Sequence, residues 1–200
     1  MRRSVSGREG GFDLRNPPHA VVVAVILVIS LLFGFLFDLA CGGIERLRYP
    51  RKYRDYVETY ASRFSVPEAV LYAVMRTESG FDPNAESGAG ACGIMQMMPS
   101  SFEWLQEKRG TVGEYTTDDL FNPEVCIDYG CYLLKYFYDY YGDERCAVAA
   151  YNAGFVVGEW LSDSNYSKDG KTLDKIPYPE TSNYVDKVES AKEMYIKLYG

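Results

Sequence analysis

The ten residues VMRTESGFDP, at positions 74–83, place one carboxylate where an apolar helical pattern ends. Glu78 follows Met75 and Leu71 at spacings of three and seven residues, so the three side chains share one helix face. Gly80 comes two residues later and supplies the left-handed conformation in which helices commonly end. The stretch therefore predicts that Glu78 lies in the last turn of a helix whose apolar face is buried.

Two features of this position favour the neutral form of Glu78. Burial disfavours the charged carboxylate, and the unpaired carbonyl groups at the end of a helix form a negative pole. A carboxylic acid that keeps its proton near neutral pH is what cleavage of a glycosidic bond requires of a general acid. The residues alone leave an alternative open, in which Glu78 caps a neighbouring backbone or pairs with Arg76.

Beyond residue 50, apolar residues recur at spacings of three and four, which is typical of helices packed around a core. No long alternation of apolar and polar residues, the pattern of a strand, is present, so the expected fold class is all-α. A polar loop or a small hairpin is expected between residues 162 and 176. The predicted helices are residues 53–64, a segment opened at Ser65 by a capping box, a segment from about Pro99, residues 122–142, residues 147–151, and a segment from about Thr181.

Residues 20–37 read AVVVAVILVISLLFGFLF and carry no charge. At 1.5 Å per residue such a helix is about 27 Å long, enough to cross the hydrocarbon core of a bilayer. We expect an uncleaved signal anchor, which divides the chain into a tail (1–19), a transmembrane helix (20–37), a juxtamembrane linker (38–50) and one globular domain (51–200). Basic residues flank the span on both sides, so charge alone does not determine its orientation.

Charge and cysteine content restrict the function classes. The formal net charge is -7, which excludes a nucleic-acid partner because phosphate binding requires a basic face. The chain has five cysteines without a CxxC pair and a single histidine, so neither a zinc site nor another metal cofactor is expected. A disulfide among the last four cysteines and buried free thiols both remain open.

Further motifs follow the glutamate in a fixed order. Residues 87–99, SGAGACGIMQMMP, combine small residues that allow close backbone approach with a glutamine that can donate and accept hydrogen bonds. AYNAG follows at 150–154, and IPYPET with a later Tyr-Val lies within 176–185. Together with ESGF at 78–81, these motifs resemble the lytic transglycosylases of the soluble (SLT) type, which share a goose-type-lysozyme-like fold. Ile94 and Cys92 depart mildly from the usual pattern of that family.

The resemblance implies that residues 51–200 form a lytic transglycosylase catalytic domain and assigns roles within it. Glu78 would be the catalytic acid. It would cleave the β-1,4 bond between N-acetylmuramic acid and N-acetylglucosamine in peptidoglycan without water, leaving 1,6-anhydro ends and using no cofactor. The implied substrate-binding residues are Ser87, Met95 and Gln96 lining the sugar cleft, Tyr151 and Asn152 beside the reacting sugar, and Glu180 and Tyr184 closing the site.

Alternatives remain at several of these positions. Tyr151 could serve core packing, and Glu180 could be an acid favoured in the first turn of a helix. On the same scaffold, a hydrolytic muramidase or a non-catalytic wall-binding component of an envelope-spanning machine would also fit. Since peptidoglycan lies outside the cell membrane, the expected location is a single-pass membrane protein with its catalytic domain on the extracytoplasmic side and residues 1–19 in the cytoplasm.

Overall fold

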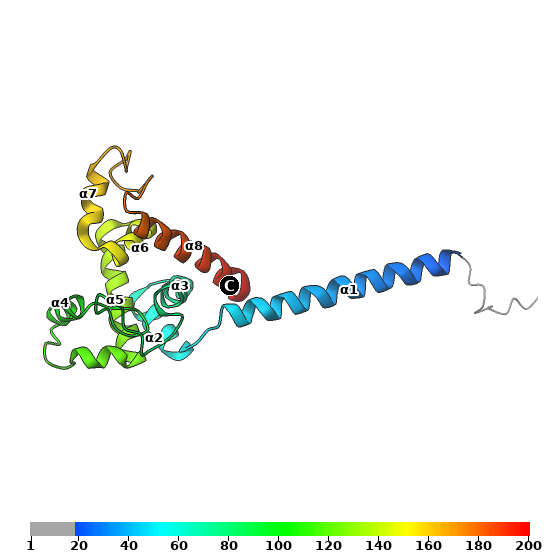
Figure 1. Ribbon diagram of the computed structural model, residues 1–200, viewed down its shortest axis with the longest axis horizontal. Helices are drawn as coiled ribbons and strands as arrows, with labels where there is room; N and C mark the ends of the chain where they lie inside the picture. The colour runs from blue at the N-terminus through cyan, green and yellow to red at the C-terminus, as the bar shows by residue number, and fades with distance from the viewer. Residues whose placement is uncertain (1–18) are drawn as a thin grey trace, which may run out of the picture. The chain divides into compact units, whose positions relative to one another are not determined.

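The computed structural model describes residues 19–200 and divides the chain after Arg48. One unit ends at Arg48 and the other covers Tyr49–Gly200 (Figure 1). The predicted cytoplasmic tail, apart from His19, lies outside the described residues.

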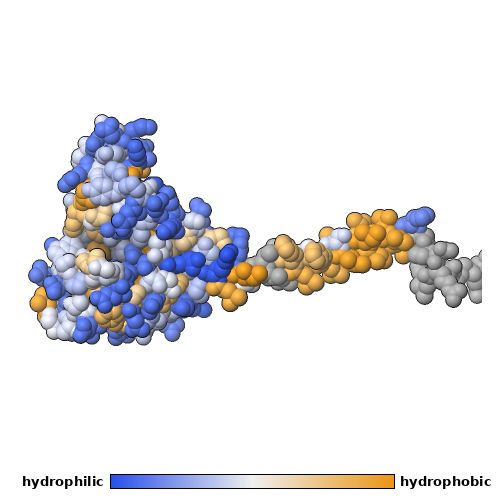
Figure 2. Space-filling view, viewed as in Figure 1, coloured by the Kyte–Doolittle hydropathy of each residue, from blue (hydrophilic) through white to orange (hydrophobic). Residues whose placement is uncertain are grey.

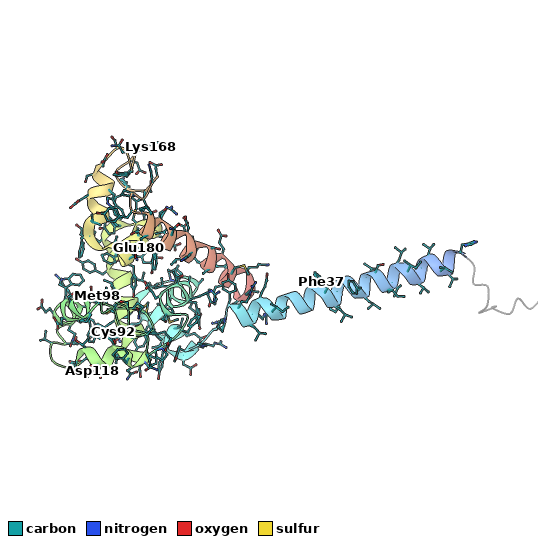
Figure 3. All side chains as sticks on the ribbon, viewed as in Figure 1. Phe37, Cys92, Met98, Asp118, Lys168 and Glu180 are labelled. Atoms are coloured by element: carbon teal, nitrogen blue, oxygen red, sulfur yellow. The ribbon has the colours of Figure 1, made fainter. Side chains whose placement is uncertain are left out.

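The first unit contains helix α1, His19–Arg48. Its segment Val21–Arg48 is the one helix among residues 19–200 that is long and apolar enough to cross a membrane, by length and composition. Figure 2 shows hydrophobic residues along much of its surface, and Phe37 is 62% exposed (Figure 3). The helix extends to Arg48, so most of the predicted juxtamembrane linker (38–50) is helical.

The second unit is mostly helical, as the sequence predicts. Between Tyr49 and Gly200 the only strand-like pairs are isolated bridges, Glu86 with Cys92 and Cys92 with Met97. The helices are α2 (Arg54–Phe64), α3 (Glu68–Ser79), α4 (Pro99–Arg109), α5 (Pro123–Tyr141), α6 (Glu144–Ala153), α7 (Val157–Ser162) and α8 (Pro179–Tyr199), with the 3-10 helices η1 (Thr117–Phe121) and η2 (Gly154–Val156).

Two buried helices organise this unit (Figure 1). Helix α3 is buried from residue 70 to residue 75, all round its axis, and packs against α8. Helix α5 contacts α2 on one side and α6 on another, and α6 in turn contacts α8. A helix that is apolar all round is stable only inside a core. This packing brings the carboxyl end of α3, where Glu78 lies, against the first turns of α8.

The capping box predicted at Ser65 is wrong. Ser65 has φ 55 and is the left-handed C-cap of α2, its N–H directed to the carbonyls of Ala61 and Ser62. Helix α3 begins at Glu68 after Pro67, without a side-chain cap. The chain uses Ser65 to end one helix because the tight connection to α3 needs a left-handed residue.

The segment between α7 and α8 contains no hairpin. Asp169 holds a local turn, accepting hydrogen bonds from the backbone of Lys171 and Thr172 and from the Thr172 hydroxyl. The short helices α7 and η1 were not predicted, and α8 starts at Pro179, before the predicted Thr181. Proline is favoured in the first helical turn, where its missing N–H costs no hydrogen bond.

The cysteines of the second unit are buried free thiols, which is the second of the two possibilities left open by the sequence. None of them forms a disulfide in the part of the chain that the structure describes. Burial raises the pKa of Cys126, Cys131 and Cys146 to about 12 in each case, so these thiols stay protonated and unreactive.

We predict that Gly130→Ala destabilises the second unit by about 1–3 kcal/mol, because it overpacks the core. A Cβ at this position of α5 would lie 2.3 Å from Sδ and 3.2 Å from Cβ of Met95, which is fully buried. Urea unfolding of the full chain in detergent measures the effect. Gly88→Ala is the control, since a Cβ there has nothing within 4 Å. Equal unfolding midpoints for the two variants would contradict the prediction.

Candidate active site

Glu78 lies in the last turn of α3, as predicted, and contacts α8. Gly80 ends the helix with φ 61, its N–H directed to Arg76 and Met75 carbonyls. The hydroxyl of Tyr184 donates a hydrogen bond of 2.7 Å to Oε1 of Glu78. Burial raises the pKa of Glu78 to about 7 from an ordinary value of 4.5, and the Tyr184 bond partly opposes this rise. Glu78 therefore keeps its proton to a higher pH than an ordinary glutamate does.

Tyr151 of α6 is near enough to Glu78 to be affected by its charge, and it is hydrogen-bonded to the loop that follows α3. Its hydroxyl donates a hydrogen bond of 2.9 Å to the carbonyl oxygen of Met95. Burial raises the pKa of Tyr151 well above its usual value, and the negative charge of Glu78 raises it further. Because its pKa is raised so far, Tyr151 stays a neutral hydrogen-bond donor at neutral pH.

The loop before α4 is shaped by its own hydrogen bonds. Gln96 has φ 47, and its side-chain Nε2 donates to the carbonyls of Ala85 and Gly93 at 3.0 and 2.9 Å. Gly93 itself must be glycine, because it has φ 76 and a Cβ there would lie 2.0 Å from the Leu120 carbonyl. The amide nitrogen of Gln96 is therefore engaged in holding this turn, and its side-chain oxygen remains as the group for a ligand.

Ser87 and Met95 also belong to this loop. Oγ of Ser87 accepts a 2.9 Å hydrogen bond from the N–H of Ala91 at a partly exposed position. Met95 departs from the expectation that it lines the sugar cleft, because it is fully buried beside Gly130. Its apolar side chain fills the core, and only its carbonyl reaches the site through Tyr151.

Asn152 and Glu180 lie near the junction of α6 and α8. Asn152 is exposed, and its Oδ1 accepts a 2.7 Å hydrogen bond from the hydroxyl of the buried Thr181. Glu180 is exposed in the first turn of α8 (Figure 3), a position at which an acid is favoured by the helix dipole. The structure therefore brings Glu78, Tyr184 and Tyr151 together, and leaves Glu180 at the surface.

A cavity of about 400 Å³ lies beside this group, a size typical of ligand sites. Tyr151 and Asn152 form part of its wall. The remaining lining residues, none of which was predicted from the sequence, are Met98, Ser100, Ser101, Trp104, Leu133, Phe137, Ala150, Ala153, Gly154 and Phe155. Met98 lies within the motif at 87–99, and Phe155 directly follows the motif at 150–154, so the motifs themselves were the available signal.

A larger cavity, of about 710 Å³, is lined by residues of α3 and α8, which include Thr77, Asn183 and Lys187. We favour the smaller one as the substrate site because it shares Tyr151 with the Glu78 cluster. Within residues 19–200, no group of three or more His, Cys, Asp or Glu side chains is arranged to hold a metal ion.

Comparison with known proteins identifies the class to which this fold and site belong. The family model of the transglycosylase SLT domain matches residues 55–173. The chain therefore belongs to the transglycosylase SLT family. The match contains Glu78, the loop and Tyr151, and it ends before Tyr184.

The relatives include soluble and membrane-bound enzymes. The soluble lytic murein transglycosylase of Escherichia coli K12 is 34% identical over 156 residues, covering 76% of this chain and 24% of that protein. The membrane-bound lytic murein transglycosylase C of Serratia proteamaculans is 34% identical over 189 residues, covering 84% of this chain and 52% of that protein. The chain thus spans about a quarter of the length of the soluble relative.

Solved structures agree with the expected lysozyme-like fold. The 70 kDa soluble lytic transglycosylase of Escherichia coli superposes with a TM-score of 0.69 at 30% identity, over 78% of this chain and 26% of that one. An inactive glutamate-to-glutamine mutant of the lytic transglycosylase Slt from Pseudomonas aeruginosa gives a TM-score of 0.66 at 30% identity, over 76% and 25%.

We predict that Tyr184→Phe raises the pKa of Glu78 above about 7. The Tyr184 hydroxyl stabilises the ionised carboxylate, so its removal shifts the equilibrium toward the protonated form. A titration of the Glu78 carboxyl carbon by NMR of the ¹³C-labelled chain measures this pKa. Tyr178→Phe, at an exposed tyrosine that packs on Trp160, should leave it unchanged. An unchanged or lower pKa in Tyr184→Phe would contradict the role assigned to the hydrogen bond.

Proposed function

We propose that this chain is a membrane-anchored peptidoglycan lytic transglycosylase. The relatives that it resembles are named lytic murein transglycosylases. The observation that carries the proposal is a glutamic acid with a pKa near 7 that accepts a hydrogen bond from Tyr184. Its charge acts on Tyr151, and Tyr151 lines a cavity. A group whose pKa lies near 7 can first donate and then accept a proton.

In the first step Glu78 donates its proton to the oxygen that bridges N-acetylmuramic acid and N-acetylglucosamine. The bond from that oxygen to C1 of the muramic acid breaks, and the bonding electrons leave with the oxygen. The sugar's own N-acetyl group stabilises the positive charge that develops at C1. The Tyr184 hydrogen bond favours the newly formed carboxylate of Glu78 and thereby stabilises the state between the two steps.

In the second step the Glu78 carboxylate accepts the proton of the C6 hydroxyl on the same muramic acid. The C6 oxygen bonds to C1, closes the 1,6-anhydro ring and completes the cleavage. No water is consumed, and Glu78 is protonated again. A single acid therefore serves as general acid and then as general base.

A one-acid mechanism is favoured over hydrolysis by the surroundings of Glu78. Most glycosidases use two carboxyl groups about 5–9.5 Å apart. Burial and the Tyr184 bond are the influences that set the pKa of Glu78, with no second carboxylate among them in the described part of the chain. A hydrolytic muramidase is the second candidate, since a water molecule could take the place of the C6 hydroxyl.

We assign the reacting sugars to the cavity beside Tyr151 and Asn152. The serine hydroxyls of Ser100 and Ser101 supply polar partners, and the oxygen of Gln96 supplies an acceptor at the loop. Ser87 contributes by holding the loop. Glu180, at the exposed start of α8, contacts substrate outside the cavity in this proposal.

We predict that Glu78→Gln lowers peptidoglycan cleavage by about 10²–10⁴-fold, because the amide keeps the shape of the acid but has no proton to transfer. Digestion of purified peptidoglycan, followed by mass spectrometry, measures the rate and the product. The wild-type product should carry 1,6-anhydro ends, lighter by one water than hydrolysed ends. Glu86→Gln, at an exposed acid in the glycine-rich loop, is the matched control and should retain activity.

The same digest separates the candidates. If the wild type produces hydrolysed ends, the proposed activity is that of a muramidase and not of a transglycosylase, and Glu78 is still required. Full activity of Glu78→Gln would refute the catalytic role of Glu78. Absence of cleavage by the wild type would favour the non-catalytic wall-binding component.

We further propose that α1 anchors the chain, with Tyr49–Gly200 on the extracytoplasmic side. The substrate lies outside the cell membrane, and a membrane-bound lytic transglycosylase is among the relatives. Protease added to intact spheroplasts should then degrade the second unit. A cytoplasmic marker protein must remain intact in the same sample. Protection of the second unit until detergent is added would contradict this orientation.

A further inference from the structure

The second unit begins at Tyr49, and this first segment is fixed to the end of α8. The Tyr199 hydroxyl donates a hydrogen bond of 2.8 Å to the Tyr49 carbonyl. The Tyr195 hydroxyl donates one of 3.1 Å to the Pro50 carbonyl. The rings of Tyr49 and Tyr195 pack edge-to-face with their centroids 5.6 Å apart. The start of the unit and the last turns of α8 therefore form one continuous surface.

A small cavity of about 260 Å³ lies at this surface and is lined by different residues from the two cavities described above. Its wall includes Tyr195 and Tyr199, together with Arg51, Glu68 and Tyr72. Sites for whole small molecules commonly measure about 300–1,000 Å³. The cavity therefore has room for a small polar group rather than for a sugar chain or a peptide.

One polar atom in the wall of this cavity lacks a partner. The side chain of Tyr72 is 2% exposed, and its hydroxyl has no hydrogen-bond partner of normal geometry in the part of the chain that the structure describes. Its ring is held in place by stacking on Tyr195, with centroids 5.2 Å apart. Buried polar groups are nearly always hydrogen-bonded, because an unmade bond costs free energy. A ligand in the cavity would supply the missing partner.

The cavity presents one charge of each sign. Nη2 of Arg51 lies 2.9 Å from Oε2 of Glu68 and 3.4 Å from Oε1 of the neighbouring Glu58. The Arg51 guanidinium also lies 5.5 and 5.4 Å from the ring centroids of Tyr72 and Tyr199. An anionic ligand would meet the two glutamates, and a cationic one would meet Arg51. A zwitterion with a phosphate and an ammonium group is complementary to both charges.

The position of this surface in the chain indicates a lipid as the source of the zwitterion. The apolar segment Val21–Arg48 has 28 residues. At 1.5 Å per residue it is about 42 Å long, which matches the roughly 40–45 Å of a bilayer with its headgroups. Tyr49 is the next residue, so the chain would leave such a bilayer at the level of the headgroups. Tyrosine is enriched at this level, where its ring is apolar and its hydroxyl meets water.

We propose that this cavity binds the headgroup of a zwitterionic phospholipid from the membrane in which α1 is anchored. The phosphate accepts hydrogen bonds from Arg51 and Tyr72, and the ammonium group pairs with Glu68. Ile196, which lines the cavity and is 53% exposed, contacts the apolar part of the lipid. The inference rests on the proposed anchoring by α1 and not on the catalytic step. It implies that the second unit is held at the bilayer surface, which limits cleavage to membrane-proximal peptidoglycan.

Native mass spectrometry tests the proposal on the full chain released from nanodiscs of phosphatidylglycerol with increasing phosphatidylethanolamine. The chain should retain one phosphatidylethanolamine in preference to phosphatidylglycerol. Tyr72→Phe keeps the ring and removes a hydroxyl that the fold does not use, so urea unfolding should be unchanged. Retention of phosphatidylethanolamine should weaken at least about tenfold, because a hydrogen bond to a charged group is lost. Tyr60→Phe, at a tyrosine that bonds Glu124, is the matched control and should retain lipid like the parent.

A second variant tests the choice of headgroup. Glu68→Gln removes the partner of the ammonium group and should shift the preference toward phosphatidylglycerol. Equal retention by Tyr72→Phe and the parent would overturn the proposal, as would an unchanged preference in Glu68→Gln. Binding of soluble glycerophosphoethanolamine in detergent without any lipid preference in nanodiscs would also overturn it, since the ligand would then not come from the membrane. Failure of the anchoring itself is distinguishable, because an unanchored chain does not enter nanodiscs, and the digest decides the catalytic proposal separately.

Discussion

The contact between α3 and α8 is the constraint on which the site depends. At this contact the Tyr184 hydroxyl from α8 donates a hydrogen bond to the Glu78 carboxyl, and partial burial raises the pKa of Glu78 to about 7. An ordinary solvated glutamate, by contrast, is ionised at neutral pH. The surroundings of Glu78 are therefore formed by two helices that are distant in sequence.

This arrangement has a cost in stability. The pKa of Glu78 is about 7 in the folded chain and 4.5 as an ordinary glutamate, so the folded state binds the proton more tightly. The corresponding stability is fully present below about pH 4.5 and is lost as the pH rises through about 7. The folded chain can bear this loss of stability, because residues 70–75 of the same helix are buried in the core. Functional sites commonly carry such unfavourable charges.

A second set of contacts connects the acid to the cavity. The carbonyl of Met95 accepts from Tyr151, and the nitrogen of Gln96 bonds the turn in which Met95 lies. A sequence motif can therefore be essential for the shape of a loop rather than for direct contact with substrate. Gln96 and Met95 illustrate this, since one uses its amide hydrogens internally and the other is fully buried.

Local patterns predicted much of the molecule, because they report interactions between near neighbours. The apolar spacing and Gly80 located the end of α3 and its acid, the absence of alternation predicted an all-α fold, and the ordered motifs indicated the family that the comparisons confirm. The same local rules failed at Ser65, where the connection between two helices, not a cap, decides the backbone conformation.

The amino-acid sequence by itself determined that a glutamic acid follows a buried helical face and that an apolar helix precedes the domain. Only the tertiary structure decided that Tyr184 donates a hydrogen bond to Glu78, that Met95 is buried in the core, and that Trp104 and Tyr140 pack against Phe155. The physical reason is that burial and hydrogen-bond partners are set by elements far apart in the chain, and spacing along one helix carries no information about them.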